Sequence, residues 1–164
     1  MRLVLIRHAA AAERPPAGRD HARPLTAEGR RRMRAAAKGL RILIPRITQI
    51  AASPTVRTQQ SALIVADRYA LPDIVSLPAL APGNAPRAML GWLRQQPGDA
   101  VLAAVGHEPD LGVMASWLLA GCRESFLPFR KGGACLIEFA GTPAPGAGLI
   151  VWLLTPNALR RLGG

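Results

Sequence analysis

Aromatic residues are scarce in this chain: they make up 4% of its 164 residues, and Tyr69 is the only tyrosine. Proteins that bind single-stranded nucleic acid stack the bases on aromatic side chains in a basic groove. The sequence also lacks an RNP-like motif and the paired cysteine and histidine spacing of a zinc finger. We therefore expect that nucleic acid is not the partner, although the formal net charge is +11.

Cysteines and long apolar runs are scarce as well. Cys122 and Cys135 stand among apolar residues, which predicts buried free thiols and neither a disulfide framework nor a zinc site. The apolar run at residues 3–6 is shorter than the ~7–15 residues of a signal-peptide core. The run at residues 111–122 is shorter than the ~20 residues that span a bilayer. These features predict a soluble, cytoplasmic protein without a membrane partner.

Acidic residues are fewer than basic ones, 10 against 21. This balance favours anionic partners, such as phosphorylated substrates or acidic protein surfaces. The few carboxylates and the lack of a Walker motif do not favour a Mg²⁺ cage, so we expect neither a metal nor a cofactor. Several basic residues lie between Arg30 and Arg46 and form either a docking face for an acidic partner or a solvated helix face.

Apolar runs alternate with segments of helical spacing along the whole sequence. A chain of 164 residues, 49% of them hydrophobic, can bury one core, so we expect a single domain over residues 1–164. The expected strands lie at residues 3–6, 50–53, 74–77, 100–105, 134–139 and 149–154. The expected helices lie at residues 26–44, 56–69, 88–95 and 109–119. Strands that alternate with helices predict a three-layer α/β/α sandwich with a mainly parallel sheet.

Two arginines and two histidines follow the expected strands. Arg7 and His8 end the first strand, and Arg57 lies in the first turn of the helix after the second. His107 follows the strand at residues 100–105. Ligands of open α/β sheets bind beyond the carboxyl ends of the strands, where these side chains would meet. Arginine binds phosphate through its planar donors and histidine can attack phosphorus, so the pattern predicts a metal-free phosphoryl pocket.

The motifs at these strand ends resemble those of the histidine phosphatase superfamily, which has the phosphoglycerate mutase-like fold. Residues 7–9, 53–62 and 106–109 are similar to its three motifs in the same order. Residues 20–29, with Asp20, Arg23, Leu25 and Thr26, resemble its short SixA-like branch. The tail, at residues 131–134 and 152–156, is similar to that branch as well.

The resemblance implies a role for each matching residue. His8 is implied to be the nucleophile that becomes transiently phosphorylated, with Arg7 and Arg57 binding the phosphoryl oxygens. His107 is implied to complete the pocket through a hydrogen bond with the same group, and water then hydrolyses the phospho-enzyme. The implied substrate is a protein phosphohistidine. The alternatives are a small-molecule phosphomonoesterase, or a catalytically idle module that binds phosphoproteins or nucleic acid.

The sequence departs from the superfamily pattern at two places. Ala9 stands where the superfamily usually has glycine, and SixA-like members tolerate alanine at this position. The loop at residues 80–84 has no carboxyl group, whereas larger members supply a general acid there. The possible acids are Glu108, Asp110 and Glu13, and the first two could instead cap a helix. An imidazole leaves without an enzymic acid more readily than an alkoxide, so the departure favours phosphohistidine.

The loops around the expected pocket are short. Only a few residues join the third strand to its helix, so no lid is expected, and an open site suits a protein-borne phosphoryl group. Arg23 and His21 could line the pocket mouth, and Arg23 could brace the loop instead. The expected state is a monomer or a weak dimer.

Overall fold

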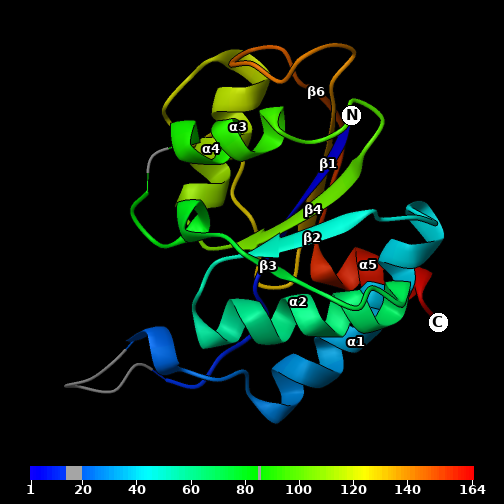
Figure 1. Cartoon of the computed structure of the whole chain (residues 1–164). Coiled ribbons are helices and arrows are strands. Elements are labelled where there is room, and N and C mark those ends of the chain that lie inside the picture. The colour runs from blue at the N-terminus through cyan, green and yellow to red at the C-terminus, as the bar shows by residue number, and fades with distance from the viewer. Residues whose placement is uncertain (14–19, 85) are drawn as a thin grey trace.

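The described residues, 1–13, 20–84 and 86–164 of a computed structural model, form a six-stranded sheet in the order β3-β2-β4-β1-β5-β6 (Figure 1). The strands are β1 (Arg2–Arg7), β2 (Gln49–Ala52), β3 (Val75–Ser76), β4 (Val101–Gly106), β5 (Ala134–Glu138) and β6 (Leu149–Leu154). β1 pairs with β4 in parallel, as β2 does with β3 and β4. β5 pairs antiparallel with β1 and with β6. The predicted mainly parallel sheet is confirmed, with an antiparallel edge.

Helices cover both faces of the sheet. They are α1 (Ala27–Leu43), α2 (Val56–Tyr69), α3 (Pro86–Arg94), α4 (Asp110–Ala120) and α5 (Pro156–Leu162), with short 3₁₀ turns at Asp20–Ala22 and Pro78–Leu80. Figure 1 shows α1, α2 and α5 on one side of the sheet and α3 and α4 on the other. The three-layer prediction is therefore confirmed.

The central strand β1 is buried on both faces, as its continuous apolar sequence predicts. Val4 and Ile6 belong to the core on the side of α1, α2 and α5. Leu3 and Leu5 belong to the separate core on the side of α3 and α4. Because both faces of β1 are packed, its carboxyl end is rigidly placed between the two helical layers.

Local signals explain where the first two helices begin and end. Thr26 is the N-cap of α1, and its side chain accepts a hydrogen bond from the Gly29 amide at 2.9 Å. Pro45 follows the C-cap residue of α1, Ile44. α2 covers residues 56–69, as predicted, and ends at Ala70 in the left-handed conformation. The first turns of α1 and α2 both lie at the carboxyl edge of the sheet.

Two features of the fold differ from expectation. The helix α5 was not predicted; it begins at Pro156, after the N-cap residue Thr155, and packs against α1 so closely that Gly39 faces the Leu159 carbonyl. Cys135 is buried as predicted, but Cys122 is exposed because it follows the end of α4 at Gly121. Part of the loop expected between residues 9 and 23, residues 14–19, lies outside the described residues. In the described part of the chain, no helix is long and apolar enough to cross a membrane.

Candidate active site

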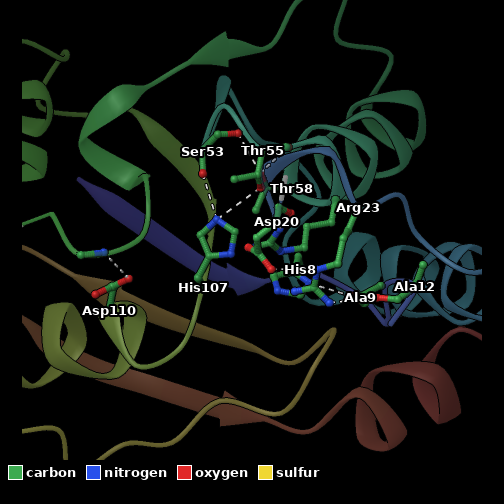
Figure 2. Close-up of polar contacts among 12 residues, drawn as sticks. His8, Ala9, Ala12, Asp20, Arg23, Ser53, Thr55, Thr58, His107 and Asp110 are labelled. Carbon is green, nitrogen blue, oxygen red and sulfur yellow. Dashed lines mark hydrogen bonds and ion pairs between the residues drawn. The ribbon is translucent and has the colours of Figure 1, made fainter. Parts of the chain in front are cut away.

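The ends of β1, β2 and β4 bring the predicted residues to one place (Figure 2). His8 follows β1, His107 follows β4, and Arg57 lies in the first turn of α2. These three residues are almost fully buried, with 7%, 4% and 4% of their surface exposed. The imidazole centroids of His8 and His107 are 5.2 Å apart, with the ring planes at 61°. The structure therefore assembles the histidines and arginines that the strand-end pattern predicts.

His8 is held as a neutral imidazole with a defined tautomer. Its Nδ1 lies 2.7 Å from the carbonyl oxygen of Ala9. A carbonyl oxygen can only accept, so Nδ1 carries the proton and Nε2 keeps its electron pair. Burial, together with the charges of Arg57, Arg7 and Lys131, lowers the pKa of His8 to about 4, although the hydrogen bond to Ala9 acts in the opposite direction. His8 therefore presents a nucleophilic nitrogen at neutral pH.

His107 faces His8 from the neighbouring strand. Its Nε2 lies 2.9 Å from the Ser53 hydroxyl and 3.4 Å from the Thr55 hydroxyl. Burial, with the charge of Arg57 acting in the same direction, lowers the pKa of His107 to about 3. Its Nδ1 is buried and has no hydrogen-bond partner among the described residues. A ligand in this pocket can therefore satisfy the second ring nitrogen.

Arg7, which directly precedes His8, is held by a loop from the last third of the chain. Its Nη1 donates a hydrogen bond to the Phe129 carbonyl at 2.6 Å. The Phe129 amide in turn donates to the Glu108 carboxylate at 2.9 Å. Burial raises the pKa of Glu108. Burial lowers the pKa of Arg7, and the charge of Glu108 opposes this effect. Within the described residues the buried Arg7 Nε has no partner, so this donor also remains for a ligand.

Arg57 is held by Asp20, a residue that the sequence analysis gave no role. The Asp20 carbonyl accepts from Arg57 Nη1 at 2.7 Å, and the Asp20 carboxylate accepts from Nη2 at 2.9 Å. Asp20 also accepts from Arg23 Nε at 2.9 Å, while Arg23 Nη1 donates to the Ala12 carbonyl at 2.9 Å. Arg23 was expected either to line the pocket mouth or to brace the first loop. Its two hydrogen bonds join residues of that loop, which is the bracing position.

A glycine turn near the start of β5 is hydrogen-bonded to the backbone of Arg7 and His8. The Gly132 amide donates to the carbonyls of Arg7 and His8 at 3.0 and 3.2 Å, and the Arg7 amide donates to the Gly133 carbonyl. Gly132 has a φ of 79°, a conformation that favours glycine. Lys131 precedes it and places a positive charge near His8. The sequence analysis noted this segment but assigned Lys131 no role.

Ala9 fits its position without glycine's conformational freedom. Its amide donates to the Ser61 hydroxyl at 3.1 Å, and Ser61 donates to the Arg57 carbonyl at 2.7 Å. Among the described residues, the only residue other than glycine with a positive φ is Ala70. Ser61 thereby links the backbone after β1 to the backbone in the first turn of α2.

The remaining candidates lie at the edges of this group. Asp110 accepts a hydrogen bond from the Gly83 amide at 3.1 Å and lines a small hollow together with His107 and Asn84. Glu13 and His21 are exposed on the first loop. In the described ranges, no group of three or more histidine, cysteine or acidic residues is arranged to hold a metal ion.

Comparisons with known proteins found a matching family and a similar protein. Residues 3–81 match the histidine phosphatase superfamily (branch 1). An uncharacterized protein of Picosynechococcus sp. (strain ATCC 27264 / PCC 7002 / PR-6) is 36% identical over 135 residues, which cover 81% of this chain and 82% of the relative.

Solved structures with a similar fold include proteins named SixA. The protein histidine phosphatase SixA complexed with tungstate has a TM-score of 0.84 and 25% identity, covering 97% of this chain and 99% of that chain. The putative phosphohistidine phosphatase SixA of Nakamurella multipartitia has a TM-score of 0.74 and 26% identity, covering 94% of this chain and 95% of that chain.

Proposed function

Because the chain belongs to the histidine phosphatase superfamily, we propose that it hydrolyses protein phosphohistidine through a covalent intermediate on His8. The observation that carries this proposal is the state of His8. Its Nδ1 proton is bound by the Ala9 carbonyl, and its Nε2 electron pair is free to attack phosphorus. The lowered pKa keeps this nitrogen unprotonated at neutral pH.

The reaction takes two displacements at phosphorus. In the first, His8 Nε2 forms a bond to phosphorus while the bond from phosphorus to the substrate imidazole breaks. The leaving imidazole keeps the electron pair of that bond and takes a proton from solvent. In the second, water attacks phosphorus, the bond to His8 breaks, and a proton passes from the water to solvent. Inorganic phosphate and the original His8 result.

Arg7 and Arg57 would stabilise the charge on the phosphoryl oxygens during both steps. Each is positioned before substrate arrives, Arg7 by Phe129 and Arg57 by Asp20. Donors that need no rearrangement stabilise a transition state more effectively than mobile ones. The charge of Lys131 at the pocket adds to this field.

Two observations support a phosphohistidine substrate. The described loop after β3 carries no carboxyl group, and imidazole is a leaving group that solvent can protonate. Of the similar solved structures, the one at 25% identity is named as the protein histidine phosphatase SixA, and the one at 26% identity as a putative phosphohistidine phosphatase SixA.

Asp110 favours a second candidate, a small-molecule phosphomonoesterase. Its carboxyl group lines the hollow beside His107, where a proton donor to an alkoxide leaving group could stand. Its bond to the Gly83 amide holds the carboxyl group in this place. The two candidates differ in whether this carboxyl group is needed for turnover.

The test compares three substrates: a phosphohistidine peptide, a phosphosugar and a chromogenic phosphate ester. Wild type should act fastest on the phosphohistidine peptide and form an acid-labile, alkali-stable phosphoryl-enzyme. His8→Ala should form none and lose at least about 1,000-fold in rate, because the nucleophile is removed. His21→Ala, which replaces an exposed histidine, serves as the matched control. Activity that survives in His8→Ala contradicts the mechanism, and a faster reaction with the phosphosugar contradicts the substrate.

A further inference from the structure

Ser53 and His107 form a buried pair directly behind the phosphoryl pocket. Ser53 follows β2 and His107 follows β4, and these strands are neighbours in the sheet. The Ser53 amide donates to the Val105 carbonyl at 3.0 Å, which sets the two residues side by side. No part of Ser53 is exposed, and its hydroxyl oxygen is 2.9 Å from His107 Nε2. This contact is therefore shielded from solvent.

The hydroxyl groups around Ser53 determine where its proton goes. Thr58 Oγ1 has one proton, which it donates to the carbonyl of Ser53 at 2.7 Å or of Thr55 at 2.8 Å. The Thr55 hydroxyl, 2.8 Å from Thr58 Oγ1, can then donate to it. Among the described residues, the Ser53 hydroxyl has one partner, His107 Nε2. The hydroxyl protons of Thr58, Thr55 and Ser53 all have an acceptor at the same time only if Ser53 donates to an unprotonated His107 Nε2.

We propose that Ser53 is a positioning residue that fixes the tautomer of His107, so that His107 donates its Nδ1–H to the phosphoryl group. This inference rests on the proposed function for its ligand. It agrees with the buried Nδ1, which has no partner in the described part of the chain. Figure 2 shows Nε2 of His107 directed at Ser53 and Thr55, with the rest of the ring on the side of His8.

The two histidines then share a tautomer but present opposite nitrogens to the pocket. His8 binds the Ala9 carbonyl through Nδ1–H and offers the electron pair of Nε2. His107 binds Ser53 through the electron pair of Nε2 and offers the proton of Nδ1. One ring can therefore attack phosphorus while the other donates to a phosphoryl oxygen.

Loss of the Ser53 hydroxyl should release His107 from this tautomer. In Ser53→Ala the ring can carry its proton on Nε2, and Nδ1 would then direct an electron pair at the phosphoryl oxygens. Removing one donor to a developing oxyanion costs about 100- to 1,000-fold in rate. Because some rings keep the productive tautomer, we expect a loss of about 10- to 100-fold in kcat. Ser53→Thr keeps a hydroxyl group and should keep most of the activity.

The direct test is the nitrogen NMR spectrum of the imidazole rings in the full-length wild-type protein. A long-range proton–nitrogen spectrum at neutral pH should show His107 with a protonated Nδ1 and a bare Nε2. Inorganic phosphate is the probe, and its addition should move the Nδ1 resonance of His107. In Ser53→Ala the Nε2-protonated form should appear. Ser116→Ala removes an equally buried hydroxyl, one that accepts from the Phe126 amide, and should leave both the tautomer and the rate unchanged.

Two results would overturn the proposal. The first is an Nε2-protonated His107 in wild type, which needs no variant and is decisive even if Ser53→Ala does not fold. The second is an unchanged tautomer and rate in a folded Ser53→Ala. Failure of the proposed function gives a different result: wild type has the expected tautomer and binds phosphate, yet no substrate is hydrolysed.

Discussion

The His8 and His107 rings meet edge to face, with their centroids 5.2 Å apart and their planes at 61°. This arrangement places two buried, neutral rings near the charges of Arg7 and Arg57. Burial opposes a charge on either ring, and the arginine charges oppose it as well. In the proposed mechanism, the arginines would provide positive charge for the phosphoryl group and would also help burial to keep His8 unprotonated.

We predict that His8 titrates near pH 4. Protonation removes the attacking electron pair, so activity is retained above this pKa and lost as the pH falls through it. At pH 5 about 90% of the His8 rings would be neutral, against about 3% for a histidine with a pKa of ~6.5. An NMR titration of the ring measures the midpoint directly, and kcat/KM with a chromogenic ester should fall in the same range. A midpoint near the ordinary value would contradict the prediction.

Asp20→Asn should separate turnover from phosphate binding. The substitution weakens the hold on Arg57 but also removes a negative charge that competes with the substrate for it. We expect kcat to fall about tenfold, because a less ordered donor stabilises the transition state less. Inhibition by inorganic phosphate should not weaken. Asp73→Asn, at an exposed position, is the matched control, and equal losses of kcat and phosphate affinity would argue against this account.

Asp110→Asn should affect substrates according to their leaving groups. We expect phosphohistidine hydrolysis to stay within about threefold of wild type, because imidazole can be protonated by solvent. Hydrolysis of an alkyl phosphate should fall at least about tenfold if this carboxyl group is the proton donor. The ratio of the two kcat/KM values is the measurement. A large loss with phosphohistidine would show that the carboxyl group is needed there too.

Two glycine-to-alanine substitutions should change stability in opposite directions. A Cβ at Gly39 in α1 would overlap the Leu159 carbonyl of α5, and the backbone of Leu159 cannot move away cheaply. We expect Gly39→Ala to destabilise the protein by about 2 kcal/mol or more. A Cβ at Gly91 in α3 would meet nothing within 4 Å, so Gly91→Ala should stabilise it by about 0.5–1 kcal/mol. Urea unfolding of both variants measures these changes in the free energy of unfolding. Similar unfolding midpoints for the two variants would refute the close contact between α1 and α5.

The sequence predicts the strands and the first four helices because their signals are local. Continuous apolar runs mark β1 and β4, and the run at residues 149–154 marks β6 over its full observed length. The direction of β5 could not be predicted, because it depends on which edge of β1 remains open. The helix α5 was missed because seven residues show little periodicity, although Thr155 and Pro156 are start signals that could have revealed it.

The site could be predicted in part for the same reason. The strand-end rule brings Arg7, His8 and His107 together without knowledge of any contact. The residues that hold them could not be found in this way, because their partners are distant in the chain. Asp20 binds Arg57, and Ser53 binds His107, through contacts that exist only in the folded molecule.

The position of β1 in the sheet affects how the protein folds during translation. β1 lies between β4 and β5, and Arg2 is in register with Val101 on one side and Glu138 on the other. The strand that carries the nucleophile therefore leaves the ribosome long before either neighbour exists. Contacts so distant in sequence close late and slow folding. A nascent chain should thus acquire its phosphoryl pocket only after β5 emerges, so β1 spends most of translation as an unpaired apolar segment that chaperones could bind.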